Sequence, residues 1–494
     1  MRLCIFFARV AFCSHPFLSA SGSPVRDLNS DDQKFPIILV HGLLGWDRET
    51  FPTYKYWGKE HHDYESSLKE AGYEVHTATI GPLSSNWDRA CELYAVVKGG
   101  QVDYGQGHAR KFKHKQLGRT YKGLYPQWGE EEPGKIKKVH FIAHSMGGPT
   151  VRMLSHLLAF GAKGSKGGIS SMVENTHPFY AGGRDWIESI TFLESPLHGT
   201  VLSNKLYPVQ AVLIPIIRAS ASLYKTLFRK PSIDLHLDQW KINSWGTFKK
   251  ALRRWALPGN SYKDTAFYSL TTKGAAKENE WIKESKEVYY FLYTTGHDIE
   301  MKGIWSKMKC PERVILQASL FCCLKPQNSE LKSKAKSTST SKSPTSSGSE
   351  AGGKWGCSND GLVETKSMAG DHVVTELKES LKLERGKWYY FAHFPFLYHA
   401  HMTGRCRDVN PINLLKAHSW LLYNLPLVAV EGNEINLQPK QAIEGKKVNL
   451  QPKQAIEGKE VILQLIEAID QVKKESAKFV CKFLPRSAVE QYEK

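Results

Sequence analysis

Residues 138–148 have the sequence KVHFIAHSMGG, in which an apolar run ends abruptly at Ser145. Residues 139–142 have the β-branched and aromatic character of a buried strand, and residues 150–158 carry apolar side chains at helical spacing. The stretch therefore predicts a strand, a sharp turn at Ser145 and the start of a helix.

The residues two before and two after Ser145 are Ala143 and Gly147, and both are small. A strand and a helix that meet at such a corner approach each other closely, and G-x-S-x-G is the pattern of a nucleophilic serine on this turn. Here alanine takes the place of the first glycine. A serine at an ordinary helix N-cap, with glycines for the turn, would have the same local sequence. The partners found elsewhere in the chain must decide between the two interpretations.

The chain has 494 residues, of which 41% are hydrophobic, and this is enough to bury a large core in one large or two medium domains. Its formal net charge is +18, without a clustered aromatic and basic motif, so we expect no nucleic-acid partner. The charge fits attraction to an anionic membrane or lipid-droplet surface, but solvated lysine faces explain it equally simply.

Residues 1–13 form a short apolar run behind one positive charge, and residues 18–22 suit signal peptidase. We therefore predict a signal peptide over residues 1–22 and a secreted protein, although Arg9 interrupts the apolar run. No later segment has the length and apolarity of a membrane-spanning helix. The nine cysteines are scattered and indicate neither a disulfide framework nor a CxxC metal site.

Residues 35–46 repeat the design of the first stretch, because an apolar strand again runs into a turn of small residues. In hydrolases that carry a nucleophilic serine on a strand-to-helix turn, the loop after such an early strand supplies one backbone N–H of the oxyanion hole. The residue after the serine supplies the other. The candidate donors are Leu43 and Met146.

Residues 81–92 have the sequence GPLSSNWDRACE, and residues 102–121 add histidines and glycines in a polar segment. Together with His41, Gly42 and the serine turn, these residues resemble the zinc-containing secreted lipases of thermophilic bacilli and staphylococci, from about residue 36 to residue 425. The resemblance implies an α/β-hydrolase fold over residues 34–425, with a mainly parallel central sheet and helices on both faces. It also implies a zinc-binding insertion over about 81–125 and a helical lid over about 205–230.

The zinc of those lipases is bound by two aspartates and two histidines, which match Asp88, His108, His114 and Asp238. From the residues alone the signal is weak, since Asp88 could cap a helix and the histidines could lie on the surface. Four nitrogen and oxygen ligands would complete a tetrahedral shell, so the resemblance implies a structural zinc.

Residues 209–228 are more apolar than a surface helix requires, and they fall where the similar lipases carry their lid. A lid exposes its apolar face to lipid when it opens. A permanently buried core helix would also explain the composition.

Residues 332–353 are rich in serine and lysine and predict a disordered insertion. The chain then reaches the Asn-Asp-Gly sequence at residues 359–361, which by itself predicts only a turn. The resemblance implies that Asp360 is the aspartate of a catalytic triad.

Residues 388–404 contain three histidines, His393, His399 and His401. Counting back without a gap from residues 408–422, which match the last helix of the family, places the triad histidine on His401. Choosing His399 would require two inserted residues. We therefore predict His401.

The similar lipases also bind calcium near the triad histidine. Here Thr403 stands where the family has a glutamate ligand, while Asp408 keeps a carboxylate. The expected calcium site has thus lost a charged ligand, and calcium binding is doubtful.

Residues 430–494 lie beyond the resemblance. Residues 435–447 recur almost unchanged at 448–460, and a third, degenerate copy starts at Val461 and predicts a helix to Lys474. Because the first two units contain proline and glycine, we expect a flexible basic tail that could bind a partner.

The chain order serine, aspartate, histidine is that of an α/β-hydrolase triad. The sequence therefore predicts a secreted serine hydrolase that cleaves lipid esters at an interface through an acyl-enzyme, most specifically a triacylglycerol lipase. A phospholipase and a short-chain carboxylesterase are alternatives. A catalytically inactive hydrolase fold that binds lipid or a partner protein is the alternative from another class.

Overall fold

The computed structural model describes the following residues: 34–46, 48, 55–58, 62–132, 135–162, 176–218, 234–242, 244, 246–250, 263–296, 358–405, 409–425 and 452–481, without the side chains at the two ends of the last segment. The chain divides into units 1–34 and 35–494, and all described residues except Lys34 belong to the second unit. The predicted signal peptide and the insertion over 332–353 lie outside the described residues.

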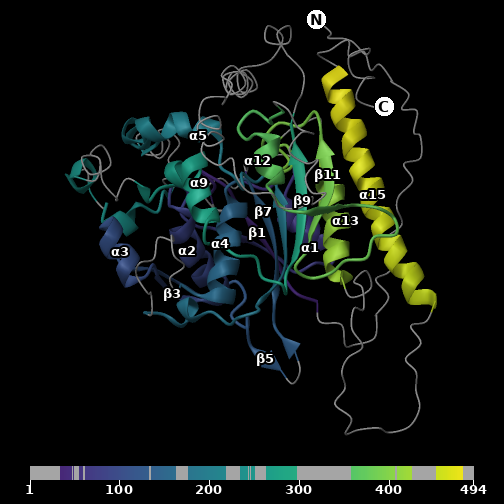
Figure 1. Cartoon of the computed structure of the whole chain (residues 1–494), viewed down its shortest axis with the longest axis horizontal. Helices are drawn as coiled ribbons and strands as arrows, with labels where there is room; N and C mark the ends of the chain where they lie inside the picture. Colours follow the sequence, from purple (N-terminus) through teal and green to yellow (C-terminus); the bar gives the residue numbers. More distant parts are fainter. Residues whose placement is uncertain are drawn as a thin grey trace, which may run out of the picture. The chain divides into compact units, whose positions relative to one another are not determined.

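Seven strands of the described chain form one sheet with the order β10-β11-β9-β8-β7-β1-β2. Figure 1 labels β11, β9, β7 and β1 of this sheet. All six pairings between neighbouring strands are parallel. The strands are β1 (Ile37–Val40), β2 (Val75–Ala78), β7 (Val139–His144), β8 (Ile187–Leu193), β9 (Tyr289–Thr295), β10 (Val374–Glu376) and β11 (Trp388–Phe394). The parallel sheet expected from the sequence is confirmed.

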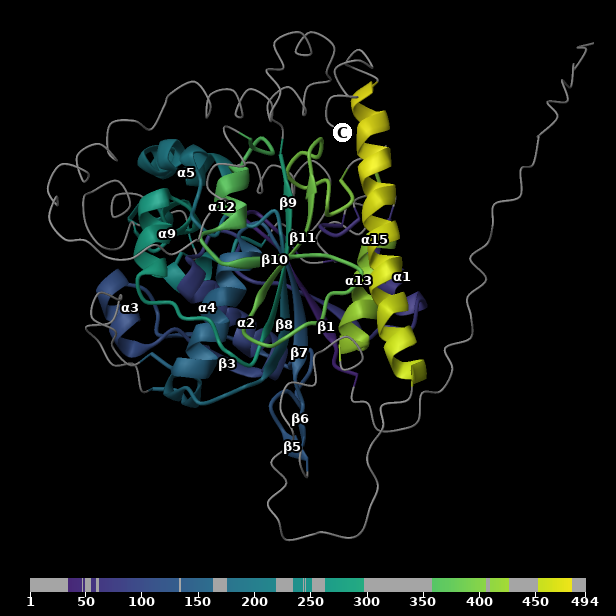
Figure 2. The same ribbon diagram turned by 45° about the vertical axis from the view of Figure 1, so that its right-hand side comes forward.

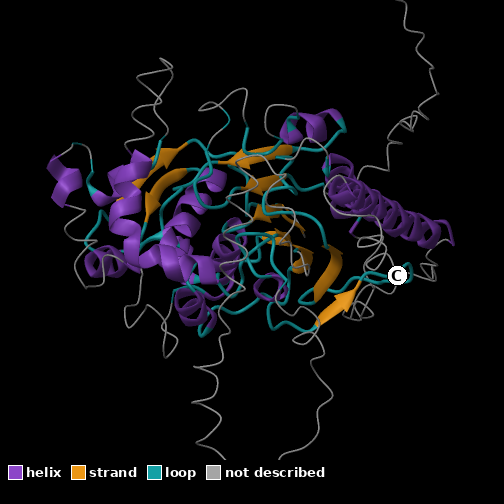
Figure 3. Ribbon diagram, turned by 90° about the horizontal axis from the view of Figure 1, so that it is seen from above, coloured by secondary structure: helices purple, strands orange, loops and turns teal. Residues whose placement is uncertain are grey.

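Helices cover both faces of this sheet (Figures 2 and 3). One face carries α2 (Asn86–Lys98) and α4 (Gly147–Phe160), and the other carries α1 (Tyr64–Glu70), α13 (Ile412–Tyr423) and α15 (Pro452–Cys481). The shorter helices are α3 (Gln106–Phe112), α5 (Val201–Leu206), α8 (Ala266–Ser269), α9 (Thr272–Asn279), α12 (Thr365–Ala369) and the 3₁₀ turns η1 (Pro178–Ala181), η2 (Tyr207–Val209) and η3 (Leu237–Trp240). Two small antiparallel ribbons pair β3 (Gly100–Asp103) with β4 (Leu117–Tyr121) and β5 (Glu131–Glu132) with β6 (Lys135–Ile136).

The two hydrophobic cores follow from the alternation of side chains along each strand. In β1, Ile37 and Leu39 pack into the core under α13, whereas Ile38 and Val40 pack into the core under α2 and α4. Strands buried on both faces must be apolar at every position, which explains why they appear in the sequence as continuous apolar runs.

Helix α15 contains the helix predicted over residues 461–474 but starts earlier, at Pro452, and it is packed on the sheet domain, unlike the expected flexible tail. Its side chains Val461, Leu465 and Ile469 are buried in the same core as those of α13. The third repeat copy has isoleucine, leucine and valine at 462, 465 and 472, where the second copy has asparagine, proline and lysine, and all three are buried. The positions at which this copy departs from the others therefore include those that make it a packed helix.

Within the part of the chain that the structure describes, no helix combines the length and apolarity needed to cross a bilayer.

Candidate active site and metal centre

Ser145 lies on a sharp turn between β7 and α4, with a left-handed φ of 55°. Its N–H donates to the carbonyl of Leu193 over 2.9 Å. A Cβ atom at Gly147 would lie only 2.6 Å from the carbonyl oxygen of Val40, so no larger residue fits there. The sharp turn and close approach that the G-x-S-x-G pattern predicts are present.

Asp360 is fully buried, and its carboxylate is held by several donors. Oδ1 accepts the N–H groups of Leu362 and Val363 over 3.0 and 2.9 Å, and Oδ2 accepts the hydroxyl of Thr295 over 3.2 Å. The Asn-Asp-Gly turn thus fixes the direction in which the carboxylate points.

The side chain of His399 lies between those of Ser145 and Asp360. Its Nδ1 lies 2.7 Å from Oδ2 of Asp360, and its Nε2 lies 2.8 Å from Oγ of Ser145. The backbone N–H of His399 also donates to the carbonyl of Asp360 over 2.9 Å. Serine, imidazole and carboxylate therefore form one continuous line of hydrogen bonds, which is the arrangement of a Ser-His-Asp triad.

The prediction of His401 is wrong in this geometry. The ring of His401 packs against Tyr398 at 5.4 Å, and its Nδ1 accepts the N–H of Tyr398 over 3.3 Å. The two histidines would point the same way in an extended strand, but β11 ends at Phe394 and Ala400 has a φ of 81°. The tight turn separates them, so the count without a gap fails in this loop.

Several charges act on the buried imidazole of His399. Burial lowers its pKa, but the charge and hydrogen bond of Asp360, together with Glu194, raise it by more. The net result is a pKa above the ordinary value, which is the direction expected of a base whose imidazolium is stabilised.

The two candidate oxyanion donors lie beside the serine. A Cβ atom at Gly42 would lie 2.7 Å from Cβ of Ser145, so the chain that leads into Leu43 passes directly against the serine. The side chain of Leu43 packs against the apolar cluster of Met146, Ala266 and Leu270. Among the described residues, the backbone N–H groups of Leu43 and Met146 have no acceptor. This arrangement is consistent with the predicted donors, whose role stays a prediction.

A helical segment over residues 210–218 packs near this loop. Ile214 is buried in an apolar cluster that Leu43 also contacts, whereas Val212 and Ile216 are 61% and 56% exposed. An apolar segment with one side packed in the cluster that Leu43 contacts and another side in solvent fits the predicted lid. The remainder of the predicted segment, residues 219–228, lies outside the described residues.

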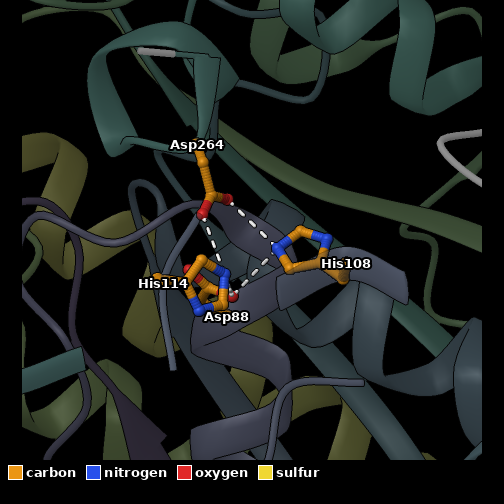
Figure 4. A group of neighbouring side chains, drawn as sticks. All are labelled: Asp88, His108, His114 and Asp264. Carbon is orange, nitrogen blue, oxygen red and sulfur yellow. Dashed lines mark ion pairs between the residues drawn. The ribbon is translucent and has the colours of Figure 1, made fainter. Parts of the chain in front are cut away.

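The second cluster of functional side chains consists of Asp88, His108, His114 and Asp264, all buried (Figure 4). They come from α2, from α3 and the loop after it, and from the segment before α8. Nε2 of His108 lies 3.1 Å from Oδ1 of Asp88 and 3.2 Å from Oδ1 of Asp264. Nε2 of His114 lies 3.2 Å from Oδ2 of Asp264 and 3.8 Å from Oδ1 of Asp88.

These separations test whether a metal fits. A tetrahedral zinc about 2.0–2.1 Å from each nitrogen or oxygen holds its ligand atoms about 3.3–3.4 Å apart. The buried oxygen Oδ1 of Asp88 and both carboxylate oxygens of Asp264 make no hydrogen bond in the described structure. The four side chains could therefore hold a metal ion such as zinc.

Neighbouring groups orient the cluster as metal ligands require. Nδ1 of His114 donates to the carbonyl of Lys115 over 2.6 Å, which leaves the lone pair on Nε2 directed into the cluster. The amide of Gln239 donates to Oδ2 of Asp88, which leaves Oδ1 for the centre.

The prediction of Asp238 as a ligand is contradicted, because Asp264 takes that place. Asp238 lies in η3 and is paired with Arg119, which also binds Asp234. Successive side chains of a 3₁₀ turn point in directions about 120° apart. As a result, the neighbouring Gln239 faces Asp88 while Asp238 faces Arg119. Nothing in the local sequence distinguishes Asp264 as a ligand.

The charges in the cluster also favour a cation. Burial lowers the pKa of His108, but Asp264 and Asp88 raise it by more, and the resulting pKa is about 9. Burial and the charge of Asp264 raise the pKa of Asp88. Two carboxylates held this close need protons or a metal ion between them.

One of the two positions of the expected calcium site lies within the described residues. Thr403 is buried and its hydroxyl donates to the carbonyl of Ala400 over 2.8 Å, while Asp408 lies outside the described residues. The loss of a charged calcium ligand at Thr403 stays a prediction from the sequence.

Comparisons with known proteins point to one group. Residues 33–313 match the family model described as "Lipase-like, C-terminal domain". Lipase 2 of Staphylococcus aureus (strain MRSA252) is 34% identical over 301 residues, which cover 56% of this chain and 40% of that protein. This chain thus spans less than half the length of that relative.

Solved structures agree. Lipase 1 from Pelosinus fermentans is 30% identical with a TM-score of 0.62, and the match covers 79% of this chain and 98% of that chain. EstA from Clostridium botulinum is 32% identical with a TM-score of 0.61, covering 80% and 88% of the two chains.

Proposed function

Because the chain belongs to the family of lipase-like C-terminal domains, we propose that it is a carboxylic ester hydrolase, most specifically a triacylglycerol lipase. One observation carries the proposal, namely that His399 lies between Ser145 and Asp360 at hydrogen-bond distance from both. All three side chains are nearly or fully buried, so water does not compete for these hydrogen bonds.

In the first half of the reaction, Oγ of Ser145 attacks the ester carbonyl carbon while Nε2 of His399 takes its proton. Asp360 stabilises the imidazolium that forms. The N–H groups of Leu43 and Met146 donate to the oxygen that becomes negative. When the tetrahedral intermediate collapses, the ester C–O bond breaks, and His399 returns the proton to the leaving alcohol. The acyl group stays on Ser145.

In the second half, His399 takes a proton from water, and the hydroxide equivalent attacks the acyl carbon. The bond to Oγ breaks, the proton returns to Ser145, and a carboxylic acid leaves. The cycle needs only water and the ester, and it uses no redox or nucleotide cofactor.

The lipid preference rests on the helical segment 210–218. Its Val212 and Ile216, and Val209 before it, are exposed apolar side chains, while Ile214 of the same segment packs in the cluster that Leu43 also contacts. Exposed apolar side chains beside the site suit a substrate presented at an oil or membrane surface. A soluble short-chain ester would not require them.

We further propose that Asp88, His108, His114 and Asp264 hold a structural zinc. When bound, the metal would supply a cross-link between α2, α3 and the segment before α8. Its four protein ligands leave no open position for water or substrate. The ester chemistry therefore belongs to the triad alone. Export through the predicted signal peptide at residues 1–22 is a separate proposal, supported by the sequence pattern.

The test is hydrolysis by the purified protein, with Ser145→Ala beside it. Emulsified long-chain triglyceride, phosphatidylcholine vesicles and a soluble short-chain ester separate the three ester classes. Fluorophosphonate labelling followed by peptide mapping should place the adduct on Ser145. A folded protein that hydrolyses none of the esters and takes up no label would instead support the inactive, lipid-binding alternative.

A further inference from the structure

Residues with a left-handed backbone gather around the proposed triad. Of the seven non-glycine residues with positive φ in the described chain, Leu44, Ser145, Glu194 and Ala400 belong to the segments that form the site. Such conformations are costly and persist only where the surroundings hold them in place. Ser145 is explained by the sharp turn, but Glu194 and Ala400 require another reason.

The carboxyl of Glu194 supplies that reason. It is fully buried, directly after β8, and its Oε2 accepts the N–H of Ala400 over 2.9 Å. Ala400 follows the triad histidine. The same oxygen lies 2.8 Å from Nε2 of His144, the residue before the nucleophile. One carboxyl oxygen therefore joins the histidine loop to the serine turn.

The connection continues to the oxyanion loop. Nδ1 of His144 lies 2.6 Å from the hydroxyl of Tyr56, and this hydroxyl accepts the N–H of Gly42 over 2.8 Å. One proton arrangement satisfies every contact. Gly42 donates to Tyr56, Tyr56 donates to Nδ1 of His144, and Nε2–H of His144 donates to Glu194.

The side chains in this series of hydrogen bonds are mostly uncharged near neutral pH. Burial raises the pKa of Glu194 to about 8, against the opposing effect of His399 and with the support of Asp360. Burial, followed by His399 and Arg405, holds the pKa of His144 well below its usual range. A neutral carboxyl can accept both N–H groups without the cost of a buried charge.

We propose that Glu194, His144 and Tyr56 are positioning residues, which hold the histidine loop and the oxyanion loop in register with Ser145. This proposal rests on the ester hydrolysis proposed above. The base and the Leu43 donor arrive on segments far apart in sequence. The hydrogen bonds link both segments, through Glu194 and Tyr56, to His144 beside the nucleophile. Small displacements of such groups slow the chemical step more than they weaken substrate binding.

The experiment compares Glu194→Ala, Glu194→Gln and Tyr56→Phe with wild type on a soluble ester. A matched control is Tyr390→Phe, which removes another buried hydroxyl, 2.6 Å from Oγ1 of Thr294 and away from the proposed chain. The readouts are kcat, KM, the rate of fluorophosphonate labelling of Ser145, and the melting temperature.

We expect Glu194→Ala and Tyr56→Phe to lower kcat roughly ten- to hundredfold while KM stays nearly constant. Glu194→Gln should recover most of the rate, because its amide oxygen can accept the same two N–H groups. The double variant Glu194→Ala with Tyr56→Phe should be little slower than the slower single variant, since both break one chain. Tyr390→Phe should leave kcat unchanged.

The proposal is overturned if Tyr56→Phe keeps wild-type kcat, or if Glu194→Gln is as slow as Glu194→Ala. Losses that follow the melting temperature, equally large in Tyr390→Phe, would also overturn it by showing a structural role alone. These results differ from failure of the proposed function, in which wild type itself neither hydrolyses esters nor takes up the label.

Discussion

Nδ1 of His399 lies 2.7 Å from Oδ2 of Asp360, and the backbone N–H of His399 also donates to the carbonyl of Asp360 over 2.9 Å. Backbone and side chain of one residue are thus both tied to the aspartate. A shift of the histidine loop relative to the Asn-Asp-Gly turn would break both hydrogen bonds. The two hydrogen bonds together therefore fix the orientation of the imidazole.

The first prediction is that His399→Ala lowers kcat on the order of a thousandfold or more, as loss of a triad member does. His401→Ala should cost less than about tenfold, because its ring contacts Tyr398 rather than Ser145. Steady-state kinetics on a soluble ester and the rate of fluorophosphonate labelling measure both effects. An inactive His401 variant beside an active His399 variant would show that His401 is the triad histidine, as the alignment without a gap predicted.

The second prediction concerns the metal ligands. Elemental analysis of the wild type should find about one zinc per chain. Asp264→Asn should lose most of it and melt at a lower temperature, because a carboxylate that faces both histidines is gone. Asp238→Asn is the matched control and should keep its zinc, since Asp238 pairs with Arg119. The reverse pattern would show that the metal is held as the sequence resemblance implied.

The third prediction is a pH profile. The pKa of His399 is raised above its ordinary value near 6.5. Only the unprotonated imidazole can accept the serine proton, so kcat/KM should fall as pH drops through this raised pKa, earlier than for an ordinary histidine. An acid limb at the pH of an ordinary histidine, or below it, would contradict the raised pKa of His399.

The fourth prediction separates the lipase from a plain esterase. Val212→Ser and Ile216→Ser should lower activity on emulsified triglyceride several-fold and leave activity on a soluble ester unchanged, because both side chains are exposed. Val373→Ser is a suitable control, since Val373 is 94% exposed on another segment. Equal activity of all variants on the emulsion would argue against a lid.

The fifth prediction concerns helix α15. Leu465 is fully buried in the core that α13 shares, so Leu465→Ala should lower the free energy of unfolding. The expected loss is about 2–5 kcal/mol. Gln464→Ala, at an exposed position of the same helix, should change it little. Chemical denaturation measures both changes. An unchanged free energy of unfolding in the Leu465 variant would support the flexible tail predicted from the sequence.

The sequence alone determined the parallel sheet and the serine turn, because both rest on local rules. Continuous apolar runs such as residues 37–40 identify strands buried on both faces. The small residues around Ser145 are required by the close approach of a strand and a helix. The resemblance to the lipase family predicted the role of Asp360, because the contiguous Asn-Asp-Gly motif matches that family. The same three residues by themselves predicted the turn.

Two assignments needed the tertiary structure. His399 and His401 are chemically identical and two residues apart, and only the backbone turn at Ala400 decides which one faces Ser145. Asp264 and Asp238 are both aspartates near a 3₁₀ or helical turn, and only the path of the chain brings Asp264 to His108. A side chain's type is written in the sequence, but its direction depends on backbone dihedrals set by contacts with residues far away in the chain.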